Sequence, residues 1–213
     1  MSTSAAIQPG RRYRGSTPDE RRAQRRERLL RAAVHVYGKV GYRQATVRAV
    51  CKAAGLTERY FYESFENSEA LLVAAYQAVN RVLLSGIKQA AAAAPPGDRV
   101  QRTRAILAAY YGALQRDPRS ARVFLIEVAG VSPAVDGVLE KALDKFAALI
   151  AETLDPAGSA SLARQPLMRT AVIGGVLHLA ITWVKSDCAA PVDEVVVAAL
   201  KTSLSLLGGS HRD

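Results

Sequence analysis

The sequence has few of the residues that stabilise disulfide-rich or metal-binding domains. Its 213 residues include two cysteines, Cys51 and Cys188, and three histidines, His35, His178 and His211. Two cysteines cannot form a disulfide framework, and these five residues show none of the spacings of zinc sites. We therefore expect a chain that folds on a hydrophobic core alone and that uses no metal and no other cofactor.

Long apolar runs are also missing. The longest mostly apolar stretch, Thr170–Val184, has 15 residues and includes His178, which is short for a membrane-spanning helix. The first ten residues, Met1–Gly10, contain no apolar segment of the kind that a signal peptide needs. The sequence therefore predicts a cytoplasmic protein without a membrane span.

Acidic residues are scarce relative to basic ones. The chain has 29 Lys and Arg against 19 Asp and Glu, a net charge of +10, and residues 1–70 hold 14 of the former and 7 of the latter. Such an excess favours a polyanionic partner for the N-terminal third, either nucleic acid or an anionic membrane surface, although a basic solubilising tail has the same composition. With 49% apolar and 23% charged residues, the chain as a whole is globular rather than disordered.

Helix signals run along the chain, and no segment shows strand alternation. Thr17, Pro18 and Glu20 form a capping box with Pro at the first helical position, and Leu30, Val34 and others continue as an apolar stripe. The pattern predicts an all-α fold of about nine helices, with Pro166 either beginning or kinking the eighth. The expected ranges are 17–39, 47–54, 57–64, 67–94, 98–116, 117–130, 132–154, 162–185 and 192–207.

The strongest local signal is Thr46–Phe65, TVRAVCKAAGLTERYFYESF. Two short helices meet at Gly55, which suits the left-handed conformation of a tight turn, and Cys51, Phe61 and Phe65 are expected to be buried. One face of the second helix remains polar: Thr57, Glu58, Arg59, Tyr60, Tyr62 and Ser64. A helix of this kind fits the major groove of B-DNA.

The segment from about Arg25 to Leu84 resembles the DNA-binding domain of the TetR family of transcriptional regulators. The resemblance rests on five motifs: Tyr37-Gly38-Lys39-Val40-Gly41-Tyr42, Ala45-Thr46-Val47, Ala53-Ala54-Gly55-Leu56-Thr57, Phe61-Tyr62-Glu63-Ser64-Phe65 and Asn67-Ser68-Glu69-Ala70-Leu71-Leu72. It implies a helix-turn-helix domain in a three-helix unit, followed by an all-helical ligand-binding and dimerisation domain. The expected divisions are a flexible basic arm (1–16), the DNA-binding domain (17–66), a connecting helix (67–94), the ligand and dimer domain (95–207) and a tail (208–213).

The resemblance also suggests which side chains contact bases. Arg48 is expected to donate two hydrogen bonds to a guanine, with a phosphate contact or a solvated side chain as alternatives. Arg59 and Tyr60 are the next candidates for base readout. Glu58 either accepts a hydrogen bond from a cytosine amino group or only stabilises the helix N-terminus.

Phosphate contacts are expected at the ends of helices. Tyr62 corresponds to a family tyrosine that binds phosphate, and Thr46 and Thr57 are read both as caps and as phosphate-facing residues. Ser68 stands where the family often has a basic residue, so its contact with a phosphate would lack a full positive charge.

The basic arm supplies further candidates. Residues 11–31 contain nine arginines and no lysine, and Arg11, Arg12 and Arg14 precede the first helix. They are predicted to contact DNA, either by inserting into the minor groove or by non-specific attraction to phosphates.

The second domain is expected to form both a dimer surface and a ligand cavity. The eighth helix is apolar almost all round and the last helix carries a matching apolar stripe. This predicts packing against a partner subunit as well as the chain's own core, with Val172, Val176, Leu179, Val196, Leu200 and Leu204 at the interface. A purely intrachain bundle is the alternative. The expected pocket is largely hydrophobic and is lined by Leu107, Tyr110, Tyr111, Leu114, Phe124, Glu127, Phe146, Ile150, His178 and Trp183.

Together these patterns predict a homodimeric, sequence-specific DNA-binding regulator. The resemblance to the TetR family implies a repressor that a small, largely hydrophobic effector releases from a palindromic operator in double-stranded DNA. A transcriptional activator of the same fold and a basic amphipathic protein on anionic membranes are the alternatives. An enzyme is not expected, because the sequence offers no nucleophile–base pair, paired carboxylates or phosphate-binding loop.

Overall fold

The computed structural model describes residues 17–95, 97–154 and 166–208. Within these ranges it contains α-helices, two short helical turns of other types and no strand, which confirms the predicted all-α fold. The helices are α1 (Pro18–Val40), α2 (Val47–Ala54), α3 (Glu58–Tyr62), α4 (Ser68–Ala93), α5 (Arg99–Arg116), α6 (Pro118–Arg122), α7 (Pro133–Leu154), α8 (Pro166–Lys185) and α9 (Val192–Gly208).

One predicted helix needs correction. The helix expected over 117–130 is divided into α6 and a π-helical turn, η2 (Val123–Glu127). In this wider turn, adjacent residues contribute to different cores: Val123 packs with α1–α4, whereas Phe124 and Leu125 pack into the bundle. The described part of α8 begins at Pro166, and the turns predicted over 162–165 lie outside the described residues.

Helix α1 begins as the sequence predicts. The Thr17 hydroxyl accepts a hydrogen bond from the Glu20 N–H at 3.1 Å, and the Glu20 carboxylate accepts one from the Thr17 N–H at 2.7 Å. Because this capping box satisfies two N–H groups that have no partner inside the helix, it stabilises the first turn. The buried stripe of α1 includes Leu29, Ala33 and Tyr37.

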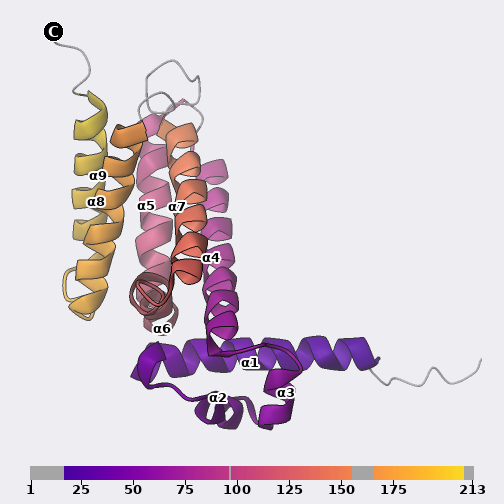
Figure 1. The fold of residues 1–213 in the computed structure, drawn as a ribbon. Helices are drawn as coiled ribbons and strands as arrows, with labels where there is room; N and C mark the ends of the chain where they lie inside the picture. The colour runs from indigo at the N-terminus through magenta and orange to yellow at the C-terminus, as the bar shows by residue number, and fades with distance from the viewer. Residues whose placement is uncertain (1–16, 96, 155–165, 209–213) are drawn as a thin grey trace, which may run out of the picture.

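The helices enclose two hydrophobic cores on either side of α1. Helices α2 and α3 lie on one side of α1, and α4 rises from its other side into the upright bundle of α5, α7, α8 and α9 (Figure 1). We call α1–α3 with the first turn of α4 the reading head; its core includes Phe61, Phe65 and Leu71. The bundle core includes Tyr76, Tyr110 and Trp183. Each fully buried side chain of this size contributes about 1.5–3 kcal/mol.

Two helices, α4 and α8, are long and apolar enough to cross a membrane by length and composition. Both supply side chains to the cores, for example Leu72 and Ile87 from α4 and Val176 from α8. Packing inside a helical bundle accounts for their apolar character without a membrane.

Candidate nucleic-acid interface

The turn between α2 and α3 has a fixed backbone. Gly55 adopts the left-handed conformation (φ 61°, ψ 42°) that the sequence predicts. The Leu56 N–H donates to the Cys51 carbonyl at 2.9 Å, and the Arg28 guanidinium donates to the carbonyls of Ala54 at 2.7 Å and Gly55 at 3.2 Å. An arginine of α1 therefore caps the C-terminus of α2 and ties the turn to α1.

Helix α3 presents its polar side chains outward. Arg59 has a side chain that is 83% exposed, and Tyr62 is 61% exposed despite its aromatic ring. Glu58 and Thr57 are also exposed. The Thr57 side chain makes no capping hydrogen bond, so its hydroxyl remains available for an external acceptor. This outward face has the residue types that read bases and phosphates.

Helix α2 and the start of α4 place further candidates outside the core. Arg48 is exposed on α2, and the Thr46 hydroxyl caps the helix by accepting from the Ala49 N–H at 3.1 Å. At α4 the cap is Asn67, whose side chain accepts from the Ala70 N–H at 2.8 Å, and half-buried Ser68 is the first helical residue.

Two candidates on α3 are already engaged within the protein. The Arg25 guanidinium lies 4.5 Å from the centre of the Tyr60 ring, a cation–π contact that covers one face of the half-buried ring. The Ser64 hydroxyl donates to the Tyr60 carbonyl at 2.9 Å. These contacts shape the end of α3 and leave Arg59 and Tyr62 as its most accessible side chains.

Several arginines of α1 hold the helix-turn-helix segment in place. Arg22 donates to the Glu63 carbonyl at 3.2 Å, Arg25 lies 3.8 Å from the Glu63 carboxylate, and Arg26 lies over the Phe65 ring at 4.8 Å. These contacts join α1 to α3 and its C-terminal turn. The sequence analysis missed Glu63, although its i, i+4 spacing from Arg59 could have identified the pair.

Glu127 lies at the junction between the reading head and the bundle. Its carboxylate accepts hydrogen bonds from the Tyr42 N–H at 2.7 Å and from the Arg122 side chain at 2.9 Å, and the side chain is only 10% exposed. The sequence grouped Glu127 with the ligand pocket, but its carboxylate is committed to these partners. Its place at the end of the π-helical turn η2 brings it to the N-terminus of the 3₁₀ turn η1 (Tyr42–Gln44).

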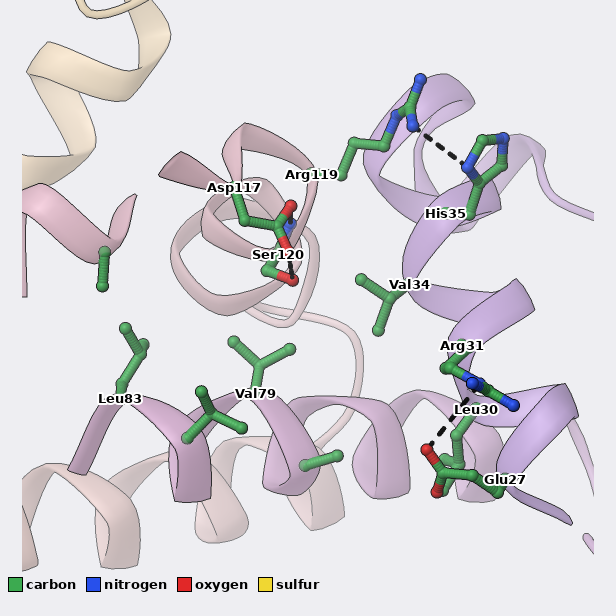
Figure 2. A pocket seen from close by; sticks show the side chains of 13 residues that line it. Glu27, Leu30, Arg31, Val34, His35, Val79, Leu83, Asp117, Arg119 and Ser120 are labelled. Atoms are coloured by element: carbon green, nitrogen blue, oxygen red, sulfur yellow. Dashed lines mark hydrogen bonds and ion pairs between the residues drawn. The ribbon is translucent and has the colours of Figure 1, made fainter. Parts of the chain in front are cut away.

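An interdomain cleft of about 420 Å³ lies between α1, α4 and the α5–α6 region. Its apolar lining includes Val34 and Leu83. Polar groups come from the Arg119–His35 hydrogen bond of 3.1 Å and from Arg31, which pairs with Glu27 at 3.9 Å (Figure 2). None of the residues expected in the ligand pocket lines this cleft. Because it touches both the head and the bundle, its shape depends on the angle between them.

Most of the predicted pocket residues form a packed aromatic and aliphatic core. Leu107, Tyr110, Tyr111, Leu114, Phe124, Phe146, Ile150 and Trp183 are buried. The Tyr111 hydroxyl donates to the Val176 carbonyl at 2.9 Å, and the Trp183 N–H donates to the Ala190 carbonyl at 2.9 Å. These two side chains have structural partners. His178 is exposed on α8 and lies apart from this core.

Two tyrosine hydroxyls in this core lack partners. Tyr76 and Tyr110 are each 1% exposed, and the structure gives neither hydroxyl a hydrogen bond. Burial, and then the neighbouring Tyr111 and Tyr76, raise the pKa of Tyr110 well above its usual value, so it is an uncharged donor at neutral pH. A groove of about 250 Å³ between α4 and α7 is lined by Tyr76 and also by Lys141 and Lys145. An unpartnered buried hydroxyl needs a polar partner, and Tyr76, which carries one of the two hydroxyls, lines this groove.

The residues expected at the dimer interface divide into two groups. Val172, Val176, Val196 and Leu200 are buried within the chain's own core, and Leu179 and Leu204 are half-buried. The free face of α8 carries other residues, among them Leu167, Gly174 and His178, and Leu167 is 85% exposed. Periodicity alone could not separate the two faces, because α8 is apolar almost all round.

Comparison with known proteins shows similarity to bacterial transcriptional regulators. The model of the family described as "Bacterial regulatory proteins, tetR family" matches residues 29–75. The HTH-type transcriptional activator FasR of Mycolicibacterium smegmatis is 23% identical over 173 residues, which cover 81% of this chain and 77% of the relative.

Solved structures extend the similarity to nearly the whole chain. The fatty acid degradation regulator FadR of Bacillus halodurans superposes with a TM-score of 0.73 at 22% identity, over 94% of this chain and 100% of that one. FadR of Bacillus subtilis, solved in complex with stearoyl-CoA, gives a TM-score of 0.71 at 18% identity, over 87% and 99%. At these identities the superpositions establish a shared fold.

Proposed function

We propose that this chain, whose residues 29–75 match the model of the tetR family of bacterial regulatory proteins, is a homodimeric transcriptional repressor that is released from its operator by a largely hydrophobic ligand. It acts in the cytoplasm by binding alone, without catalysis. The proposed domains are those that the sequence predicted: a basic arm (1–16), a DNA-binding domain (17–66), a connecting helix (67–94) and a ligand-binding and dimerisation domain (95–207).

DNA recognition rests on the exposed face of α3. Arg59 and Tyr62 project from a helix that follows the turn held by Arg28, and Arg22 donates to the Glu63 carbonyl at the end of this helix. Arg48 of α2 flanks this face. We assign Arg48 and Arg59 to bases and Tyr62, Thr46, Thr57 and Ser68 to phosphates.

A homodimer would present two copies of this DNA-binding face. The free face of α8 carries exposed Leu167 and is open around Gly174, where an added side chain would meet no atom within 4 Å. Exposed apolar and small residues permit close packing with the same face of a second subunit. A two-fold axis through that contact predicts an operator that is an inverted repeat.

The ligand that we propose combines an apolar chain with an anionic group. The aromatic core offers apolar surroundings and two unpartnered hydroxyls, Tyr76 and Tyr110, while Lys141 and Lys145 lie at the groove that leads to Tyr76. The Bacillus subtilis FadR structure contains stearoyl-CoA, a molecule of this type. Long-chain acyl thioesters are therefore the class of ligand to test first.

The turn η2 would couple the proposed ligand site to the DNA-binding face. The Phe124 ring stacks on Tyr76 with centroids 5.4 Å apart, and Glu127, three residues later, holds the Tyr42 N–H. A ligand that shifts Tyr76 would move one end of η2 and weaken the hydrogen bond at the other end. The dimer would then favour a spacing of its heads that does not match the operator, which is a population shift.

Selection of bound sequences from random duplex DNA tests the assignment. We expect the full-length chain to enrich an inverted repeat with half-sites about one helical turn apart or a small multiple of it. Binding of one labelled operator is then measured with and without stearoyl-CoA, with free coenzyme A as the control. Enrichment of no sequence would contradict specific DNA recognition, and unchanged operator binding with stearoyl-CoA would contradict the proposed ligand class.

Activation of transcription is the second candidate function. FasR, the relative from Mycolicibacterium smegmatis, is described as an activator. A reporter gene under a promoter that contains the selected operator distinguishes the two, because deleting the regulator raises expression for a repressor and lowers it for an activator.

A further inference from the structure

Arg59 and Glu63 form an ion pair on the outward face of α3. The Arg59 Nε donates to Glu63 Oε1 at 3.0 Å across one helical turn. The Arg59 side chain is 83% exposed, whereas that of Glu63 is 37% exposed. The arginine therefore reaches into solvent while its carboxylate partner lies closer to the protein surface.

Glu63 is itself held from behind by α1. Arg25 lies 3.8 Å from the second carboxylate oxygen, and Arg22 donates to the Glu63 carbonyl at 3.2 Å. The Arg25 guanidinium also lies over Tyr60, which is one residue from Arg59 on the same helix. Two arginines of α1 thus hold Glu63, one at its carboxylate and one at its carbonyl, before any DNA is bound.

The pair uses one particular edge of the Arg59 guanidinium. An arginine can donate two parallel hydrogen bonds either through Nε and one terminal nitrogen or through both terminal nitrogens. With Nε bonded to Glu63, only the edge formed by Nη1 and Nη2 can make such a pair with DNA. Guanine O6 and N7 in the major groove accept this arrangement, whereas a phosphate can be contacted in many orientations.

We propose that Glu63 is a specificity-determining positioning residue, which holds Arg59 in the orientation that reads one guanine through its two terminal nitrogens. This inference rests on the proposed function as a sequence-specific DNA-binding regulator. Because the ion pair already restricts the Arg59 side chain before DNA binds, less conformational entropy is lost on binding. More of the free energy of the guanine contact then appears as a preference for guanine over other bases. Glu63 itself touches no base.

The alternative is an ordinary surface pair between residues i and i+4. Such pairs contribute about 0.3–0.5 kcal/mol to stability and no specificity. Both hypotheses predict that Arg59 and Glu63 variants fold normally, so a measurement of unfolding free energy does not distinguish the positioning role from an ordinary surface pair. They differ in the DNA sequences that the variants bind.

The test compares base preference at each operator position for the full-length protein and its variants. The wild-type chain first selects its operator from random duplexes, and Arg59→Ala identifies the guanine position that Arg59 reads. Glu63→Ala is expected to lower the preference for guanine at that same position by about three- to tenfold and to leave the other positions unchanged. Glu63→Gln, which retains an oxygen acceptor for Nε, should keep most of the preference.

A charge control and a double variant complete the experiment. Glu66→Ala removes the same charge from an exposed residue just beyond α3 and should leave every base preference unchanged. In an Arg59→Ala background, Glu63→Ala should have no further effect at the guanine position. A Glu63→Ala protein that keeps its guanine preference, or that loses preference equally at all positions, would overturn the inference. A wild-type chain that selects no sequence would instead refute the proposed function.

Discussion

The Glu127 carboxylate accepts a hydrogen bond from the Tyr42 N–H at 2.7 Å, although 85 residues separate the two along the chain. Nearby, Arg43 donates to the Gly130 carbonyl at 3.2 Å, and the Ser132 hydroxyl donates to the Glu69 carboxylate at 2.8 Å. These three contacts join the reading head to the segment that follows α6. They make this segment a physical connection between the reading head and the helical bundle.

Glu127→Ala is expected to destabilise the chain by about 1.5–3 kcal/mol, because it leaves the Tyr42 N–H without its charged acceptor in a partly buried site. Denaturant unfolding of the full-length protein measures the change. Glu140→Ala, at an exposed position of α7, removes the same charge and should change the free energy of unfolding by less than about 0.5 kcal/mol. Equal effects of the two substitutions would argue against a junction role for Glu127.

Gly38→Ala is expected to separate α1 from α6. A Cβ at this position would lie 2.6 Å from the Arg119 Cβ and 2.7 Å from its carbonyl oxygen, so backbone must move. We expect a loss of about 1–3 kcal/mol in unfolding free energy. Gly86→Ala in α4, where the added Cβ meets nothing within 4 Å, should instead stabilise the helix by about 0.5–1 kcal/mol. The sign of the two changes checks the close approach of α1 and α6.

Arg28→Ala is expected to loosen the turn between α2 and α3. The substitution removes donors to the Ala54 and Gly55 carbonyls, and a loss of about 1–2 kcal/mol in unfolding free energy follows for hydrogen bonds from a charged group. Amide hydrogen exchange should rise at Gly55 and Leu56, whose N–H groups close the turn. Arg31→Ala removes only an exposed pair with Glu27 at 3.9 Å and serves as the control. Unchanged exchange in Arg28→Ala would show that the glycine turn holds without α1.

Replacing Arg11, Arg12 and Arg14 with Ala is expected to weaken the dependence of DNA affinity on salt. These residues lie outside the described part of the chain. Each phosphate contact that is lost should flatten the slope of log K against log salt by about 0.9. Replacing exposed Arg81, Lys88 and Arg104 changes the net charge equally and should alter the slope less. Identical slopes for the two variants would assign the arm only a general electrostatic role.

Local chemistry was enough to predict the reading head. The capping box at Thr17, the left-handed Gly55 and the buried Phe61 depend on residues close in sequence, and the structure confirms all three. The family motifs between Tyr37 and Leu72 then indicated DNA binding, because they specify both the turn and the outward face of the second helix. The division of an apparently continuous helix into α6 and η2 was not predicted. It places Val123 in the core of the reading head and Phe124 in the core of the bundle, and only the tertiary structure brings these two cores together.

The sequence by itself determined the helical class, the helix-turn-helix segment and the residues that could face DNA, because period, caps and turn chemistry act over a few residues. Tertiary structure decided which polar groups are engaged. It placed Glu127 at the junction rather than in a pocket, turned Val172 and Val176 into the chain's own core, and bound Arg25 to Glu63 behind Arg59. These outcomes depend on contacts between residues distant in sequence, whose partners no local pattern specifies.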